Sequence, residues 1–273
     1  MNHVRFLAWC ALVANSVLAM GTATAADWKI FEVDLISPRN MTYTPQALMP
    51  IVFALQNPAL SDTTAATIFW SVWEGNNQTS PGSVTDGGLE LDFGDDWNRS
   101  SSEPYFVTRF FNTVDYPEGL WTLSWSLQLY NCSDNPEKQG VQFITTSNTT
   151  TFTVSRQSGK APDLVAATSS ETCGATVAYA YNVTGGESGC GFIGPNVTAN
   201  PCSVTINPSA ASSIMAAATE MACSPMETGV YPNVSCPAFP VKSSNNAAPP
   251  HMAAIVSTWL TLLTLVTALI HLR

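Results

Sequence analysis

Histidine is nearly absent from this sequence. The 273 residues contain three, namely His3, His251 and His271. As argued below, the first lies in an expected leader and the other two follow an expected cleavage site near the end of the chain. The remaining protein would then have no histidine, which excludes Ser–His and Cys–His nucleophile pairs and His-ligated zinc or copper sites. A copper oxygenase that needs an amino-terminal histidine is excluded for the same reason.

Cysteine pairs at short spacing and basic residues are also scarce. No C-x-x-C occurs, which argues against a redox motif or a zinc site. Between Asp27 and Asn246 eight basic residues face twenty acidic ones, a net charge of −12. An acidic surface of this kind is not suited to nucleic acid or anionic lipid. We therefore expect no nucleic-acid partner and no cofactor.

Both ends of the chain are apolar. Residues 1–25 combine Arg5, an apolar stretch from Phe6 to Met20 and an A-x-A pattern at Ala23–Ala25. This is typical of a secretory signal peptide cut after Ala25 or Ala26. A membrane anchor or a buried helix is the alternative, but the apolar stretch is short for a membrane span.

The final stretch, residues 253–273, resembles a membrane span without the basic flank that normally fixes its orientation. Small residues precede it, followed by a polar, Pro-containing spacer within residues 241–252. This order is typical of a glycosylphosphatidylinositol (GPI) attachment signal, which is removed. We expect attachment at Asn245 or Asn246, with Ser243 and Ser244 as alternatives. A single membrane span at the tail is the competing interpretation.

Cysteine usage agrees with secretion. Apart from Cys10 in the leader, the chain has Cys132, Cys173, Cys190, Cys202, Cys223 and Cys236. Six cysteines in an exported chain predict three disulfides, whose pairing the sequence leaves open. Five of the six lie in the second half, so at least one bridge would connect this Cys-rich part to the first half.

Sequons for N-glycosylation are about twice as frequent as chance predicts. Eight N-x-[ST] sites begin at Asn40, Asn77, Asn98, Asn131, Asn148, Asn182, Asn196 and Asn233. Asn131 ranks last because Cys132 occupies its middle position. An occupied site must lie on the surface, since a glycan cannot enter a core.

Residues 27–160 alternate between apolar and polar side chains with a period of two, as in Leu120–Tyr130 and Ile30–Leu35. Such alternation predicts strands with one buried face. We also expect strands at residues 49–55, 66–73, 103–111, 141–145 and 150–154, separated by turns such as Gly87-Gly88. The fold class expected is mainly β, an immunoglobulin-like antiparallel β-sandwich.

Residues 161–240 differ in composition and are rich in Gly, Ala, Ser, Asn and Cys. We expect a Cys-rich extension with strands at 176–183 and 202–207, tied to the sandwich by a disulfide. Residues 208–223 predict one helix, because Ala and Met favour helix and a Ser can cap its start.

Acidic and aromatic residues supply the remaining candidates for chemistry. The cluster Glu90, Asp92, Asp95 and Asp96 could form a solvated loop, a weak cation site or a catalytic carboxylate pair. Its spacing matches no calcium loop, and a solvated loop is the preferred interpretation, with no metal. Trp70, Trp121 and Trp125 fall on apolar strand faces and are expected in the core. Trp28, Trp73 and Trp97 could be exposed and stack on sugars.

Three stretches carry a resemblance to a known family: "FEVDLISPRNMTYTP", "LMPIVFALQNPAL" and "YPEGLWTLSWSLQLYNCS". With the Cys-rich part and the anchor signal, they resemble an uncharacterised family of secreted, often GPI-anchored proteins of filamentous fungi. The resemblance implies a fungal surface glycoprotein and assigns no site residue.

Together, these sequence features favour a non-enzymatic GPI-anchored glycoprotein of the outer plasma membrane or cell wall, with a structural or interaction role. Its expected partners are the membrane, through the lipid, and wall glucan or another surface polysaccharide. The alternative is a carbohydrate-binding or carbohydrate-acting protein that uses exposed Trp and the acids from Glu90 to Asp96.

Overall fold

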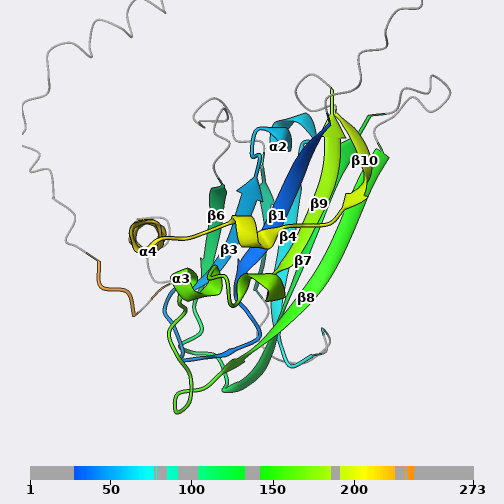
Figure 1. Cartoon of the computed structure of the whole chain (residues 1–273). Coiled ribbons are helices and arrows are strands. Elements are labelled where there is room, and N and C mark those ends of the chain that lie inside the picture. The colour runs from blue at the N-terminus through cyan, green and yellow to red at the C-terminus, as the bar shows by residue number, and fades with distance from the viewer. Residues whose placement is uncertain are drawn as a thin grey trace, which may run out of the picture. The chain divides into compact units, whose positions relative to one another are not determined.

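Two five-stranded sheets form the fold (Figure 1). The computed structural model describes residues 28–76, 78, 85–91, 104–132, 142–185, 191–224, 231 and 233–236. The first sheet has the strand order β10-β9-β1-β3-β6, made of Phe192–Val197, Val177–Thr184, Lys29–Ser37, Met49–Gln56 and Tyr105–Phe111. The second has the order β2-β8-β7-β4-β5, made of Thr42–Tyr43, Gln142–Val154, Gly119–Asn131, Thr67–Glu74 and Thr85–Glu90. All pairings are antiparallel except that of β2 with β8.

The inner faces of the two sheets share one apolar core. Phe31, Val33 and Leu35 of β1 point into it, and so do alternate residues of β7, including Trp121 and Trp125. The indole of Trp125 packs against the ring of Phe53, with ring centroids 5.2 Å apart. The period-two alternation therefore predicted the buried faces correctly, and the mainly β, two-sheet fold is confirmed.

The strand predictions differ from the structure in four places. Residues 141–145 and 150–154 belong to one long strand, β8. Gly87-Gly88, expected as a turn, lies inside β5 opposite Trp70 and Phe69. The strand expected at 202–207 is instead a 3-10 turn, η3 (Pro201–Ser203), followed by irregular chain, and β10 had no prediction. Thr122 is one of the polar residues that alternate within Leu120–Tyr130, but it is buried, and its hydroxyl donates to the Gly75 carbonyl (2.6 Å).

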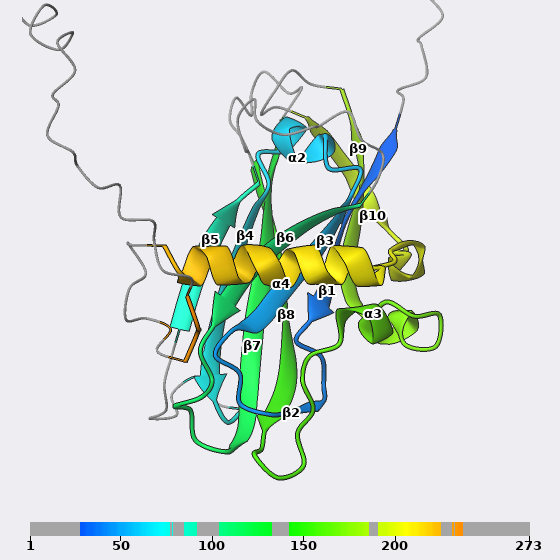
Figure 2. The same ribbon diagram turned by 90° about the vertical axis from the view of Figure 1, so that its left-hand side faces the viewer.

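A helix covers the outer face of the first sheet. α4 (Pro208–Ala222) crosses the strands of that sheet (Figure 2). Ile214 and Ala218 of α4 pack with Val52, Ala54 and Phe110 in a second apolar cluster. The predicted helix is confirmed, although its first turn is capped by Asn207, whose side chain accepts from the Ala210 amide (2.9 Å), and not by Ser. Because α4 covers this face, both faces of β1 and β3 are buried.

The segment that follows residue 161 is continuous with the sandwich. It contributes β9 and β10 to the first sheet, and β9 pairs with β1 from Lys29 to Leu35. It also contributes two short turns, α3 (Leu164–Ala167) and η2 (Cys173–Ala175). A disulfide joins Cys173 to Cys202, with Cα atoms 5.0 Å apart, and Cys132, Cys223 and Cys236 are disulfide-bonded as well.

The chain divides into two compact units, Met1–Ser235 and Cys236–Arg273, and the fold described above belongs to the first. Among the described residues, no helix has the length and apolar character needed to cross a membrane. The expected leader and the apolar tail lie outside the described residues.

Candidate functional site

A pocket of about 880 Å³ lies where the end of β1, the middle of β8 and the segment from Lys160 to Val177 meet. This volume falls within the range of about 300–1,000 Å³ that is usual for small-molecule sites. Much of its lining is apolar, including Leu35, Ile36, Pro38, Met41, Leu164, Ala167 and Val177. Its polar lining includes Arg39, Asn40, Thr149, Thr150, Thr151, Lys160, Asp163, Glu171 and Thr172. The site therefore offers an apolar body with charged and hydroxyl groups around it.

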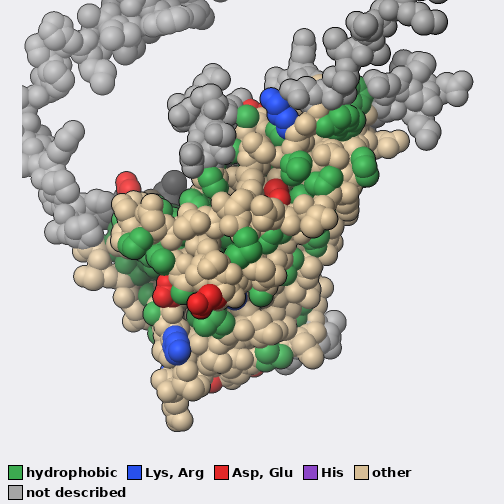
Figure 3. Space-filling view, viewed as in Figure 1, with side chains coloured by type: hydrophobic (Ala, Val, Ile, Leu, Met, Phe, Trp, Pro, Cys, Tyr) green, Lys and Arg blue, Asp and Glu red, His purple; other side chains and the backbone are tan. Residues whose placement is uncertain are grey.

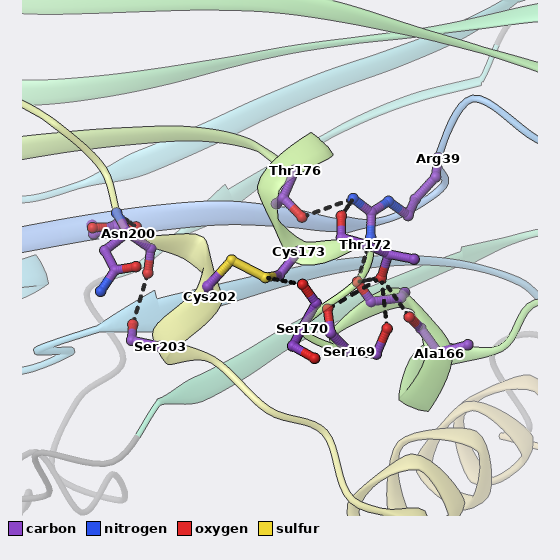
Figure 4. The surroundings of a disulfide bond; sticks show 12 residues. Arg39, Ala166, Ser169, Ser170, Thr172, Cys173, Thr176, Asn200, Cys202 and Ser203 are labelled. Atoms are coloured by element: carbon purple, nitrogen blue, oxygen red, sulfur yellow. Dashed lines mark hydrogen bonds between the residues drawn. A yellow bond between two sulfur atoms is a disulfide. The ribbon is translucent and has the colours of Figure 1, made fainter.

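Arg39 organises one wall of this pocket (Figure 4). Its guanidinium donates to the carbonyl of Ala167, to the carbonyl of Thr172 (2.7 Å) and to the hydroxyl of Thr176 (3.0 Å). The planar fork of an arginine suits three acceptors at fixed positions. Partial burial lowers the pKa of Arg39, yet an arginine of this kind remains charged at physiological pH. No carboxylate forms an ion pair with Arg39 in the described part of the chain.

The other polar groups around the pocket are partly committed to the backbone. The hydroxyl of Tyr43 accepts from the Arg39 amide (2.9 Å), which shapes the loop after β1. The carboxylate of Asp163 accepts from the Ala166 amide (2.9 Å) and so caps α3. Burial raises the pKa of the Tyr43 hydroxyl, so that it stays neutral at physiological pH. Lys160 is exposed at the rim, and its ammonium group is not part of an ion pair among the described residues.

A second polar cluster lies on the outer face of β1, beneath the segment before α4. Glu32 and Asp34 are two residues apart and both are buried, with Asp34 0% exposed. The Gln56 amide donates to Asp34 (2.9 Å), and the Asn200 amide donates to Glu32 (2.7 Å). Burial raises the pKa of Asp34 to about 8, the hydrogen bond from Gln56 opposes this shift, and the neighbouring Glu32 adds to it.

This acidic cluster connects the segment before α4 to the outer face of the first sheet. The Ser203 hydroxyl donates to the Gln56 side chain (2.5 Å) and to the Asn200 carbonyl (2.8 Å). Cys202, within the same turn, holds the disulfide to Cys173 (Figure 4). Because both carboxyls are covered by this turn, the cluster acts as a structural contact and does not face a substrate.

The sequons divide by exposure. Asn40, Asn148, Asn196 and Asn233 are exposed, as glycosylation requires. Asn182 is half-buried on β9, and the half-buried Asn131 side chain accepts from the Ile193 amide (2.9 Å). Asn77 and Asn98 lie outside the described residues. The engagement of Asn131 agrees with its low rank, while occupancy at every site stays a prediction.

The predicted sugar-binding residues do not come together. Trp73 is 6% exposed, so the expectation that it could stack on a sugar is wrong, because its indole is buried on the outer side of β4. Trp28 is 47% exposed, as expected, and packs over Gly194 of β10. Glu90 ends β5, whereas Asp92, Asp95, Asp96 and Trp97 lie outside the described residues.

Some predicted features cannot be placed. Cys190 and the GPI attachment candidates Ser243, Ser244, Asn245 and Asn246 lie outside the described residues. Within the described ranges, no group of three or more His, Cys, Asp or Glu side chains could hold a metal ion.

Sequence reasoning missed the pocket and the acidic cluster. The pocket walls come from three separate segments, and no local pattern connects them. A signal for the cluster was present, since Glu32 and Asp34 alternate with apolar residues on β1, but alternation alone predicts a wet outer face. Only the tertiary contacts of the turn η3 with this face explain the burial of the two acids.

Figure 3 shows few charged side chains on the face in view, among apolar side chains and the tan surface of the other side chains and the backbone. No curated protein is significantly similar to this chain. Residues 26–236, which include both sheets and the pocket, match the family described as "Domain of unknown function (DUF7136)". The chain therefore belongs to the DUF7136 family.

Proposed function

We propose that this protein is a GPI-anchored glycoprotein of the cell surface or cell wall with a binding role, not a catalytic one. The leader, the small-residue run before the apolar tail, the sequons and the cysteines support an exported, anchored chain. The resemblance to secreted fungal proteins supports a wall-bearing cell as its setting. The observation that carries the binding role is the pocket at the edge of the sandwich.

The pocket best suits a small amphipathic ligand with an acidic head group. Its inner lining is mostly aliphatic, which favours an apolar body. Two cations, Arg39 and Lys160, lie in its lining without an ion pair to a described carboxylate. Asp163 and Glu171 in the same lining balance the formal charge of these cations, and a carboxylate or phosphate on the ligand would pair directly with Arg39 or Lys160.

A catalytic role receives less support from the same groups. The guanidinium of Arg39 is bonded to backbone carbonyls, and the carboxylate of Asp163 caps a helix. Both side chains are thus held in place by structural contacts. Asn40 lines the pocket and begins a sequon, so a glycan there would stand at the entrance.

Binding can be tested with medium-chain fatty acids on the secreted fragment from Asp27 to Asn246. We expect dodecanoate to bind with micromolar affinity by calorimetry, and dodecanol to bind about tenfold more weakly, which is 1.4 kcal/mol. Lys160→Gln should remove most of that difference, because it deletes the exposed cation. Ala175→Trp should block the pocket, whereas Val165→Trp serves as the matched control, since Val165 is exposed and does not line it.

Two outcomes would contradict ligand binding in the pocket. Equal binding by Ala175→Trp and Val165→Trp, or no binding of either amphiphile, would show that this cavity is not the ligand site.

A further inference from the structure

The outer face of the second sheet carries no charge over its central strands. β7 and β8 together contain no Asp, Glu, Lys or Arg. The pairing places Ser71, Ser124 and Thr149 in one row across β4, β7 and β8. The next two rows are Phe69, Ser126 and Ser147, and then Thr67, Gln128 and Thr145. Apart from Phe69, these rows form a grid of neutral hydroxyl and amide residues across three strands, about 4.8 Å from strand to strand, and on β5 the first and third rows continue to Asp86 and Glu90.

Aromatic rings stand on the same face. Phe143 is 57% exposed and Phe69 is 46% exposed, values that are unusual for phenylalanine. Tyr130 pairs with Phe143 across β7 and β8, with ring centroids 4.5 Å apart. Phe69 lies opposite Ser126, four residues along β7 from Tyr130. The grid thus has an aromatic pair at one end and a single ring toward its middle.

The described helices leave the grid rows open, whereas the next row of the same face, Trp73 and Thr122, is buried. α3 and α4 lie on the side of the first sheet, away from the outer side of β7 and β8 (Figures 1 and 2). Asn148 belongs to β8, but it pairs with the core residue Trp125, so it belongs to the inward-facing set and not to this grid. The exposed sequon at Asn40 lies in the loop after β1, and the one at Asn196 lies in the first sheet. Asn40, Asn148 and Asn196 therefore lie off the grid.

We propose that this face binds a neutral polysaccharide with flat, β-linked sugar rings. The rings of such a polymer have apolar faces, which can pack on Phe69, Tyr130 and Phe143, and hydroxyl edges, which can bond to the Ser, Thr and Gln grid. The charge of the protein favours a neutral polymer over an acidic one. A net charge of −12 from Asp27 to Asn246 repels acidic polymers, and β7 and β8 carry no ion that a neutral polymer would have to desolvate. This inference does not depend on the pocket or on the lipid anchor.

The proposal can be tested by sedimentation of the Asp27–Asn246 fragment with insoluble β-1,3-glucan, cellulose and chitin, and with an acidic polysaccharide gel as the charged comparison. We expect binding to at least one neutral polymer that persists in about 1 M salt, because no ion pair is involved. Phe143→Ser combined with Phe69→Ser should weaken it about tenfold or more, as truncation of anchor residues commonly does.

Trp28→Ser is the matched control, because Trp28 is about as exposed as Phe69 but packs over Gly194 of the first sheet. All three changes remove exposed rings, and circular dichroism checks that each variant is folded. Unchanged binding by the double variant, preference for the acidic gel, or no sedimentation with any neutral polymer would overturn the proposal. So would self-association of the wild type that the double variant loses, since it would assign the face to a second copy. Ligand binding in the pocket would be unaffected by these outcomes.

Discussion

At the residue scale, the buried pair Glu32 and Asp34 is the most informative feature. Two carboxyls are enclosed side by side on β1, and a raised pKa shows that the fold favours the protonated form of Asp34. Ionisation of Asp34 destabilises the folded state but not the unfolded chain, which exposes the same carboxyl group to water.

Stability should therefore fall as pH rises. The folded pKa of about 8 exceeds the ordinary value of 3.8, so between these values the native chain binds a proton that the unfolded chain releases. The free energy of unfolding should decrease on the order of 1 kcal/mol per pH unit over this window. Urea titrations at pH 5 and pH 8 measure the slope, and Asp34→Asn should flatten it and stabilise the protein at pH 8.

Glu118→Gln is the control for this measurement. Glu118 is exposed, and hydrogen bonds from Arg156 lower its pKa below 4.5, so its contribution changes only in acid. Its replacement should leave the slope between pH 5 and pH 8 unchanged. A wild-type stability that is constant or rising over that range would contradict the assignment of the slope to Asp34.

At the element scale, β5 shows how a strand can contain residues that normally indicate a turn. Gly87 lies directly opposite Trp70, and a Cβ at this position would lie 2.8 Å from the indole ring. The glycine is required because the buried indole fills the place of a side chain. Gly88, its neighbour, faces Phe69 at an ordinary 3.5 Å.

The two glycines therefore make a matched pair. Gly87→Ala should lower the free energy of unfolding by about 1–3 kcal/mol, because the indole must shift in a packed core. Gly88→Ala should change it by less than about 0.5 kcal/mol, as surface substitutions usually do. Chemical unfolding of both variants measures the difference. Equal effects would mean that close packing on Trp70 is not the reason for glycine at position 87.

The elements that sequence predicted best are those with a strong periodic pattern. β1, β3, β4 and β7 were predicted within a few residues, since their aromatic and branched side chains alternate against a single core. α4 was predicted from its Ala and Met content. β5 was missed because its glycines conceal a strand. The irregular chain after η3 contains β-branched residues that pack on the outer side of the first sheet without joining it, as Val204 and Ile206 do.

The candidate sites were less predictable than the strands. The pocket needs the loop after β1, the middle of β8 and α3 to meet, and those contacts are remote in sequence. The uncharged outer face depends on the register of three strands, which no single strand reveals. Sequence alone placed the sugar hypothesis on Trp28, Trp73 and Trp97, whereas among the described residues of the second sheet the exposed rings are Phe69 and Phe143.

At the scale of the whole molecule, we propose a disulfide-bonded ectodomain that is held at the membrane by a lipid anchor. The bridge between Cys173 and Cys202 closes a loop of 29 residues, which is worth about 3–4 kcal/mol by the chain-entropy argument. A domain held in this way suits exposure outside the cell, where disulfides persist. Of the residues named for its two candidate binding surfaces, Thr149 of β8 is shared, since it lines the pocket and belongs to the grid.

The central claim is display by a lipid anchor, and release by phosphatidylinositol-specific phospholipase C from intact cells tests it most directly. The account predicts that the enzyme releases the protein. It also predicts that the intact mass of the released chain, after glycan removal, begins near Asp27 and ends between Ser243 and Asn246 with the remnant of the anchor. Protein that stays in the membrane after treatment and retains Arg273 would contradict the account.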